Sequence, residues 1–398
     1  MDPACRGRRS RVAGRSPAVF VWSVAAATGM AACGARTIVD TATAVVPGYS
    51  SEAGTDATDA DERSDVSIDH VEDAKPDGSM DAEDDTAGCA PAGDAGVTPL
   101  SCAPGGPGLS DCGPTGESCC TSPEVPCGTY LRSYDGVTFK DTHHPATVSG
   151  FRLDKYEISV GRFRGFVGAV VAGWLPTRAS GKHARLNRGK GLSATSGGYE
   201  PGWDETWNAQ LPTTSDAWTA VLTCGGEGAS WTAMVGANER RPVECLSWYA
   251  AYAFCIWDGG FLPSEAEWNY AAAGGASPGG QRAYPWSDPP MSTSIDCAHA
   301  VFCGGPDDVG TDSPLGDGAF GQADLAGNLW EWTLDIHMPH ELYFDPCDNC
   351  VDLRSGPSRS IRGGTFVNPA NQLLTSVRHF HLPEDPIPLI GARCARSP

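Results

Sequence analysis

Tryptophan is unevenly distributed along this chain of 398 residues, and that distribution limits the possible folds more than any other feature. Of the 12 tryptophans, all but Trp22 lie between Trp174 and Trp332. Large indole side chains need burial in a core, so this interval is predicted to be the centre of one folded domain. Within it, residues 173–242 are rich in Gly, Thr and Asn and have little periodicity. Long ordered loops are therefore expected there, and such loops often carry binding surfaces.

Two adjoining helices are the clearest secondary structure in the sequence. Ser247 is a predicted N-cap for a helix that Gly259 ends. The sequence Ser264-Glu-Ala-Glu267 has the pattern of a capping box and opens a second helix, which Gly274 ends. The other predicted elements are a helix after Ser159 with Phe163, Phe166, Val167 and Val170 on one face, and strands within 127–158, 360–366 and 390–394.

Sixteen cysteines indicate an oxidising compartment, because a reduced cytosolic protein seldom carries so many. Six of them fall in residues 89–127, a piece too short to bury a core and therefore predicted to be held by disulfides. Adjacent cysteines rarely have the geometry to bridge each other, so Cys119 and Cys120 are expected to bond to two separate partners. Cys347 and Cys350 suggest a redox dithiol by spacing, but no βαβ pattern surrounds them and a small structural bridge is favoured.

The N-terminus has the features of an export signal. Five arginines within the first 15 residues precede an apolar stretch, 18–32, that is short for a membrane span. The stretch ends in Met-Ala-Ala-Cys33, which resembles a bacterial lipobox, so residues 1–33 are predicted to be a signal peptide with Cys33 lipidated. Signal cleavage nearby without a lipid is the alternative. The protein would then be held at the bacterial cell envelope, on its periplasmic or surface face.

The charge of the chain is concentrated in one segment. Residues 52–85 hold 14 acidic and 2 basic residues, a net charge of −12, whereas residues 127–398 have a net charge of −9. We therefore predict that residues 34–88 are an acidic, disordered linker. No basic run lies outside the first 16 residues, so nucleic-acid binding is not expected.

The stretch Asp324–Trp332, with sequence Asp-Leu-Ala-Gly-Asn-Leu-Trp-Glu-Trp, combines two carboxylates with a Gly-Asn turn among large indoles. Hard cations bind carboxylates together with backbone carbonyls, and a glycine turn lets carbonyls point at one spot. A Ca²⁺ site is therefore one interpretation. A surface turn whose tryptophans fill a core is the other, and spacing alone does not exclude it.

A series of motifs in fixed order resembles the formylglycine-generating enzymes, or sulfatase-modifying factors. The motifs are Leu246-Ser-Trp248, Ala253–Trp257, Phe261-Leu-Pro-Ser-Glu-Ala-Glu-Trp268, Tyr270–Gly275, Tyr284-Pro-Trp286, Asp324–Trp332, Arg362-Gly-Gly-Thr365 and Gly391-Ala-Arg-Cys394. The resemblance covers residues 128–398. It implies a loop-rich α+β fold related to C-type lectins, with the linker and the cysteine-rich segment, 89–127, in front of it.

The resemblance also implies particular site residues. Family members oxidise a sulfatase cysteine to formylglycine with oxygen and a copper ion held by two cysteines, but Asn368 and Leu373 stand at those two positions here. Soft Cu(I) prefers thiolates, so copper is not expected. The resemblance further implies a disulfide between Cys255 and Cys394. It also implies a structural Ca²⁺ bound by the side chains of Asp324 and Glu331 and by the carbonyls of Gly327 and Leu329.

These observations predict an exported, lipid-anchored protein that binds an unknown protein or small ligand in the family's cleft, with Thr365 and Arg378 as candidate lining residues. One alternative is an oxidoreductase of the family type, or other chemistry in the same pocket, and another is a purely structural envelope component. His379 and His381 would share one face of a strand and could hold a metal. Exposed or packed histidines are the more ordinary interpretation of that pair.

Overall fold

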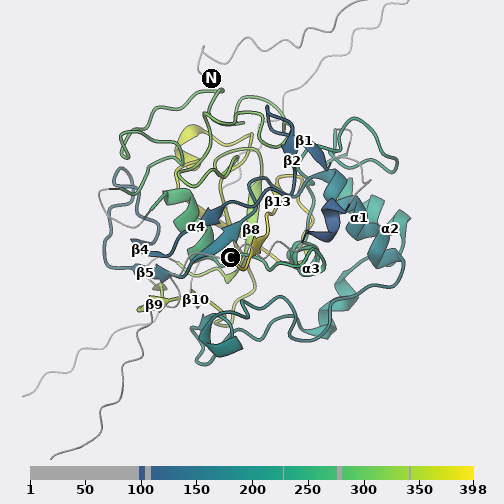
Figure 1. Ribbon diagram of the computed structural model, residues 1–398, viewed down its shortest axis with the longest axis horizontal. Helices are drawn as coiled ribbons and strands as arrows, with labels where there is room; N and C mark the ends of the chain where they lie inside the picture. The colour runs from purple at the N-terminus through teal and green to yellow at the C-terminus, as the bar shows by residue number, and fades with distance from the viewer. Residues whose placement is uncertain (1–97, 104–108, 227, 276–279, 340–341) are drawn as a thin grey trace, which may run out of the picture. The chain divides into compact units, whose positions relative to one another are not determined.

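The computed structural model describes residues 98–103, 109–226, 228–275, 280–339 and 342–398 (Figure 1). Predictions for residues 1–33 and 34–88, including the lipidation of Cys33, lie outside the described residues. The α-helices of the described part are α1 (Val160–Val171), α2 (Ser215–Leu222), α3 (Trp248–Trp257) and α4 (Glu265–Ala273). Short 3-10 helices are η3 (Leu100–Cys102), η4 (Asn187–Gly189), η5 (Glu205–Gln210) and η7 (Ala370–Gln372).

The strands are short, and long loops connect them. In chain order they are β1 (Ser110–Cys112), β2 (Glu117–Ser118), β3 (Glu124–Val125), β4 (Gly128–Leu131), β5 (Pro145–Val148), β6 (Phe151–Leu153), β7 (Ser193–Ala194), β8 (Trp330–Ile336), β9 (Cys347–Asp348), β10 (Cys350–Val351), β11 (Arg359–Arg362), β12 (Arg378–His381), β13 (Ile390–Gly391) and β14 (Ala395–Arg396). This mixture of separate helices and strands is the α+β, loop-rich class predicted from the sequence.

A four-stranded sheet has the order β12-β11-β8-β13. Strand β11 is antiparallel to β8 and β12, whereas β13 runs parallel to β8. The register places Ile361 opposite both His379 and Trp332. Because side chains alternate along a strand, Trp330, Ile361, His379 and His381 lie on the same face of the sheet. The other sheets are β14-β6-β3, β4-β5-β9 and the two pairs β1-β2 and β10-β7.

The helix starts follow the predicted caps. The Ser159 and Ser247 hydroxyls accept from the third backbone N–H of α1 and α3, and Ser264 forms a full capping box with Glu267 on α4. Gly274 ends α4 with φ of 74°, in the left-handed region that favours glycine. Helices α3 and α4 are buried on almost every side, so they form the interior of the domain and not an amphipathic surface layer.

The tryptophan-rich interval does form the core. Trp203, Trp218 and Trp231, all from the region 173–242, are buried in the same cluster as Trp248 and Trp332. The region 173–242 is not entirely loop, however, because it contains α2 and η5. The hydroxyl of Thr214 caps α2, and Trp218 and Leu222 anchor that helix in the core.

Disulfides join distant parts of the domain. Cys255 on α3 is bonded to Cys394 just before β14, as the family resemblance implies. Cys347 and Cys350 form the predicted small bridge. Cys119 and Cys120 do bond to separate partners, and the remaining bridges with both ends described are Cys102–Cys120, Cys112–Cys119, Cys224–Cys245 and Cys297–Cys303. Each bridge restricts the unfolded chain and so favours the folded state.

Part of the cysteine-rich segment packs onto the domain. Cys112 and Cys119 lie in a small buried cluster with Tyr156, and β3 pairs with β6. The guanidinium of Arg162 on α1 donates to the carbonyl of Cys119 at 3.3 Å. The second half of this segment therefore packs against the domain.

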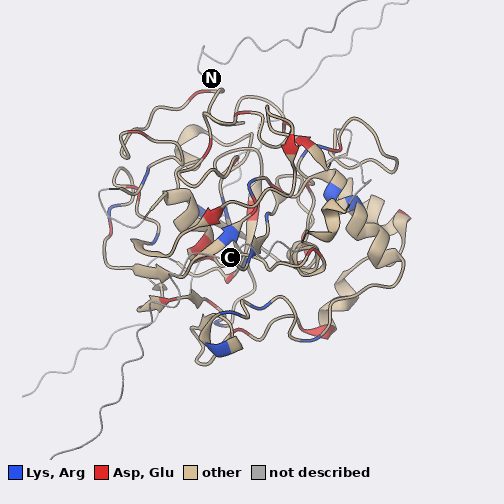
Figure 2. Cartoon of the chain, in the orientation of Figure 1, with Lys and Arg blue, Asp and Glu red and all other residues tan. Residues whose placement is uncertain are grey.

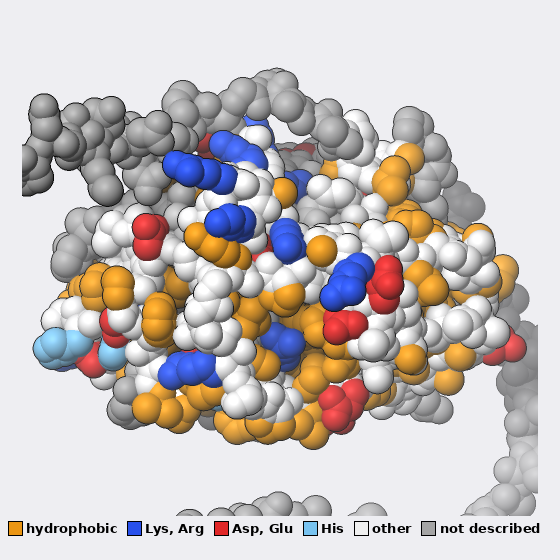
Figure 3. Space-filling model, turned by 90° about the horizontal axis from the view of Figure 1, so that it is seen from below, with side chains coloured by type: hydrophobic (Ala, Val, Ile, Leu, Met, Phe, Trp, Pro, Cys, Tyr) orange, Lys and Arg blue, Asp and Glu red, His pale blue; other side chains and the backbone are white. Residues whose placement is uncertain are grey.

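Among the described residues, no helix is both long and apolar enough to cross a bilayer. The segment 178–190 carries five Lys or Arg residues and no acidic residue, and four of the five are exposed. Figure 2 shows this segment at the bottom of the molecule, and Figure 3 shows Lys and Arg side chains gathered over part of the face seen from that side. The basic residues of the described part are thus partly clustered, which the sequence prediction does not include. The prediction that nucleic acid is not a partner remains a prediction.

Candidate functional site

A cleft of about 200 Å³ opens on one face of the β12-β11-β8-β13 sheet. Aromatic and aliphatic residues line it together with four polar residues. The lining residues are Trp330, Ile361, Ile387, Leu389 and Ile390 with Asn368, Gln372, His379 and His381. A concave, mostly apolar surface with a few converging polar groups is the usual form of a ligand site.

The loop that carries Asn368 follows the glycine turn after β11. Gly363 and Gly364 have φ of 100° and 76°, which glycine adopts without strain. The Asn368 side chain accepts from the backbone N–H of Thr365 at 2.9 Å, and its backbone N–H donates to the Thr365 carbonyl at 2.9 Å. These two bonds hold Asn368 at the cleft. Leu373, nearby on the same loop, is buried in the core.

The structure places Thr365 and Arg378 outside this cleft, contrary to the expectation that both line it. The Thr365 hydroxyl is buried and donates to the carbonyl of Asn328 at 2.9 Å. Arg378 alternates with His379 along β12, so its side chain lies on the opposite face of the sheet. There it pairs with the buried Glu265 carboxylate.

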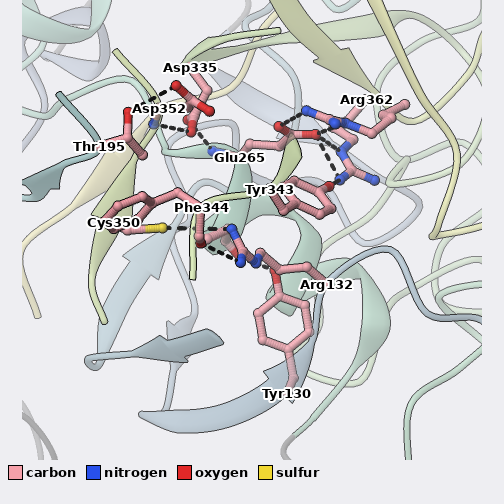
Figure 4. Close-up of a pocket in the computed structure, with 12 residues that line it drawn as sticks. Tyr130, Arg132, Thr195, Glu265, Asp335, Tyr343, Phe344, Cys350, Asp352 and Arg362 are labelled. Atoms are coloured by element: carbon pink, nitrogen blue, oxygen red, sulfur yellow. Dashed lines mark hydrogen bonds and ion pairs between the residues drawn. The ribbon is translucent and has the colours of Figure 1, made fainter. Parts of the chain in front are cut away.

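The Arg378 side adjoins a much smaller cavity of about 10 Å³ (Figure 4). Arg362 and Arg378 both bind Glu265, the first residue of α4. Burial would raise the pKa of Glu265, but the two guanidinium groups outweigh burial and hold it well below its ordinary range. This volume admits about one water molecule. The paired charges therefore fasten α4 to the sheet and leave little room for a ligand.

The two histidines lie as the strand alternation predicts. The rings of His379 and His381 are 6.2 Å apart between centroids, and the His379 ring lies 5.8 Å from that of Trp330. Burial lowers the pKa of His381, and the neighbouring His379 lowers it further. His381 is therefore predominantly neutral at neutral pH. The sequence did not predict that the cleft is also lined by Trp330, Gln372 and the segment 387–390. Contacts between residues distant in sequence bring them to this face.

The loop between Asp324 and Glu331 is fixed by its glycine turn. Gly327 has φ of 90°, and a Cβ there would lie 2.6 Å from the carbonyl oxygen of Val301, so another residue would clash. The Gly327 N–H donates to the carbonyl of Gly363 at 3.0 Å. The predicted Ca²⁺ loop is thus tied directly to the turn that precedes the cleft.

Glu331, one of the expected Ca²⁺ ligands, has other partners in the structure. Both of its carboxylate oxygens accept from the buried Arg393 guanidinium at 2.7 Å. The indole N–H of Trp268 donates to the same carboxylate at 2.9 Å. Within the described residues, no group of three or more His, Cys, Asp or Glu side chains is placed to hold a metal ion. Any Ca²⁺ at this loop would therefore depend on backbone carbonyls and Asp324 more than on Glu331.

Two buried carboxyl groups, those of Glu157 and Asp324, lie at this loop. Burial raises the pKa of Glu157 well above its ordinary value, and the negative charges of Asp324 and Glu331 raise it further. Burial also raises the pKa of Asp324 to about 7, although the N–H of Gly310 opposes the change. Neither Glu157 nor Asp324 forms an ion pair with a described side chain. A cation beside them would reduce the cost of burying two carboxylates.

Comparison of the sequence with known proteins identifies a family. Residues 117–398 match the model of the sulfatase-modifying factor enzyme 1-like domain. Formylglycine-generating enzyme of Mus musculus is 27% identical over 314 residues, which span 73% of this chain and 78% of that protein. Inactive C-alpha-formylglycine-generating enzyme 2 of Mus musculus is 26% identical, and the match covers 69% of this chain and 84% of that protein. Hercynine oxygenase of Mycobacterium tuberculosis is 30% identical, and the match covers 36% of this chain and 34% of that protein. Because the family model spans more than half of the chain, this protein belongs to the formylglycine-generating, or sulfatase-modifying factor, domain family.

Proposed function

We propose that the protein is exported and lipid-anchored at the bacterial envelope, and that its domain binds a protein segment or small ligand in the cleft beside Asn368 without oxidising cysteine. The observation that carries the proposal is the combination of an open cleft with Asn368 and Leu373 at the two family cysteine positions. The resemblance to the family assigns its two reaction cysteines to these positions, so the thiol pair that the family reaction requires is not expected here.

The chemistry of the remaining side chains supports binding over oxidation. Copper in its reduced state prefers thiolates, and neither an amide nor a leucine replaces them. No cysteine occurs between Cys350 and Cys394. Every cysteine that the structure describes is disulfide-bonded. In the described part of the chain, no free thiol is therefore available to hold copper or to receive a substrate sulfur.

The cleft lining suits a ligand with both apolar and hydrogen-bonding groups. Trp330 and the aliphatic residues offer apolar contact, while the amides of Asn368 and Gln372 can each donate and accept hydrogen bonds. The comparisons include a mouse relative whose name calls it inactive, so a domain of this kind without the family activity has a precedent. A purely structural envelope component would need no such opening.

Two further parts of the proposal concern anchoring and stability. The lipid on Cys33 would hold the protein at the membrane, with the acidic segment as a spacer. A Ca²⁺ ion at the Asp324 loop, with Gly327 and Leu329 carbonyls, would be structural and not catalytic. The two buried carboxyl groups of Asp324 and Glu157 beside the loop support this ion, while the Arg393 partner of Glu331 makes a weaker ligand set than the family resemblance implies.

Site-specific photo-crosslinking in the producing cell tests the binding function. A photoreactive residue replaces Gln372, which lines the cleft, and in a control it replaces Met234, which is 79% exposed and does not line it. We expect a discrete cross-linked species, identified by mass spectrometry, at position 372 and not at position 234. Identical patterns at the two positions, or none at 372, would contradict a cleft-bound ligand.

The oxidoreductase alternative makes a different prediction for the same protein. The family includes oxygenases as well as formylglycine-generating enzymes by the names of the relatives above. If this protein is an enzyme of the family type, it must turn over a cysteine substrate despite Asn368 and Leu373.

A further inference from the structure

Another small pocket is lined by aromatic side chains together with one arginine. Its lining residues are Glu200, Pro201, Gly202, Trp207, Trp248, Tyr252, Leu334, Leu353 and Arg359. None of them lines the cleft beside Asn368. The open volume inside is about 20 Å³, which admits one or two water-sized groups and not a whole ligand. Only the polar head of a ligand would enter, and the rest would lie on the surface outside.

The contacts of Arg359 leave one edge of its guanidinium unused. Nη1 donates to the carbonyl of Leu334 at 2.7 Å. The ring of Trp248 covers the guanidinium, with its centroid 3.8 Å from the Arg359 Cζ atom. Nε and Nη2 have no hydrogen-bond partner in the described part of the chain. These two nitrogens form the edge that binds both oxygens of a carboxylate with two parallel hydrogen bonds.

Arg359 is also a cation without an ion-pair partner. Burial lowers its pKa to about 10, although the negative charge of Asp335 opposes the change, so the side chain stays charged at neutral pH. No described carboxylate forms an ion pair with it. The Asp335 carboxylate accepts instead from the backbone N–H groups of Glu265 and Asp352, at 2.6 and 2.8 Å. Holding a cation away from water without an anion costs free energy, and a ligand carboxylate would reduce that cost.

Glu200 is the one acidic residue that lines the pocket, and its charge is already balanced. Its carboxylate lies 3.0 Å from Nδ1 of His183 and accepts from the backbone N–H groups of His183 and Leu192, at 2.5 and 3.1 Å. The ring of His183 carries the compensating positive charge, because Glu200 and Glu267 hold it protonated despite its burial. Glu200 therefore does not act as the counter-ion of Arg359.

The basic segment 178–190 runs beside this pocket. Tyr252, which lines the pocket, donates its hydroxyl to the carbonyl of Gly181 at 3.2 Å. The N–H of Ala179 donates to the carbonyl of Trp203, next to the pocket residue Gly202, at 2.8 Å. Four of the five Lys and Arg residues in the segment are exposed. Their positive charge would attract an anion toward the pocket.

We propose that Arg359 binds a carboxylate that carries an apolar group, either the C-terminus of a protein segment that ends in an aliphatic residue or a small aliphatic acid. The carboxylate would bind the Nε and Nη2 edge, and the small volume favours this planar group over a larger tetrahedral anion. The apolar group would contact the indole and aliphatic side chains at the pocket, such as Trp207 and Leu353. This site is separate from the proposed function in the cleft and does not depend on it.

Calorimetric titration of the full chain with N-acetyl-leucine and with N-acetyl-leucinamide tests the site. The two probes differ only in that the amide has no negative charge. For the wild type we expect the acid to bind at least tenfold more tightly, because hydrogen bonds to a charged group contribute more than neutral ones. Arg359→Gln should weaken binding of the acid by about tenfold or more, and Arg359→Lys should weaken it less, since lysine keeps the charge and loses the planar edge. Arg240→Gln, at a side chain that is 48% exposed and does not line the pocket, is the matched control and should leave the affinity unchanged.

An acetylated pentapeptide with a free C-terminal leucine distinguishes the two sources of the carboxylate. Affinity at least tenfold above that of N-acetyl-leucine assigns the site to a protein C-terminus, and equal affinity assigns it to a small acid. Hydrogen exchange of the wild type locates the site without any variant: the acid, and not the amide, should protect the segments 200–207 and 353–359. Equal binding of acid and amide, no binding of any probe, or unchanged affinity in a folded Arg359→Gln would overturn the inference.

Discussion

Replacement of His183 by glutamine is predicted to destabilise the domain in a way that depends on pH. The His183 ring is 2% exposed, with Nδ1 3.0 Å from the Glu200 carboxylate and Nε2 3.0 Å from Glu267. Both ring nitrogens act as donors only when the imidazole is protonated. His183 is therefore a buried cation between two buried anions. The Glu267 carboxylate also completes the capping box of α4, so the cation supports the start of that helix.

The size of the effect follows from the pKa of His183. Burial favours the neutral ring, but Glu267 and Glu200 outweigh burial and raise the pKa from 6.5 to about 10. Because the folded state holds its proton more tightly than the unfolded state, this contribution is complete below pH 6.5 and is lost as pH rises toward 10. Between pH 6 and pH 9 the loss amounts to about 3 kcal/mol. At a pH where His183 is fully protonated, its removal should lower the free energy of unfolding by about 3–5 kcal/mol, because two buried carboxylates lose their cationic partner.

Denaturant unfolding at several pH values, with the disulfides intact, measures the loss of unfolding free energy and its dependence on pH. The destabilisation caused by His183→Gln should be largest near pH 6 and should narrow by about 3 kcal/mol by pH 9. Groups common to both proteins cancel in this difference. His143→Gln, at an exposed histidine, should change stability little at any pH. A destabilisation that is independent of pH, or no larger than that of the control, would refute the assignment of His183 as a buried cation.

Four other predictions concern anchoring, metal binding and structural bonds. Metabolic labelling with a fatty acid should mark the wild type and not Cys33→Ala, and equal labelling of the two would exclude lipidation. Chelator should lower the melting temperature and added Ca²⁺ should restore it, because the ion would bind only the folded state; no change in either step would remove the Ca²⁺ site. The double variant Cys255→Ala/Cys394→Ala should lose roughly 4–5 kcal/mol, since the bridge spans 139 residues, and unchanged unfolding would contradict this. Arg393→Met should lose about 3–5 kcal/mol because it leaves Glu331 buried without its partner, whereas Glu331→Gln/Arg393→Met together should lose less.

The parts of the fold that were predicted correctly depend on local sequence patterns. Ser159, Ser247 and Ser264 announce helix starts because capping depends on a few adjacent residues. Helix α2 was missed, although Thr214 caps it, because eight residues within a Gly- and Thr-rich region give too short a period to recognise. The Cys255–Cys394 bridge came from the family resemblance, since spacing alone permits many pairings.

The cleft was harder to predict because it depends on contacts distant in sequence. Alternation along β12 indicates that His379 and His381 share a face and that Arg378 does not. It does not indicate which face is open. That depends on Glu265, 113 residues away, which binds Arg378 on the other side. Likewise, local sequence patterns do not reveal that Arg393 is the buried partner of Glu331.

The most direct test of the central claim is mass spectrometry of a sulfatase-type Cys-x-Pro-x-Arg peptide incubated with the purified protein, copper and oxygen. A family member with two active-site cysteines serves as the positive control under the same conditions. The account predicts that the peptide cysteine stays unmodified, because Asn368 and Leu373 provide neither a copper ligand nor a thiol. Conversion of the cysteine to the aldehyde by the wild type, abolished by Asn368→Ala, would contradict the binding function and require an oxidase site in this cleft.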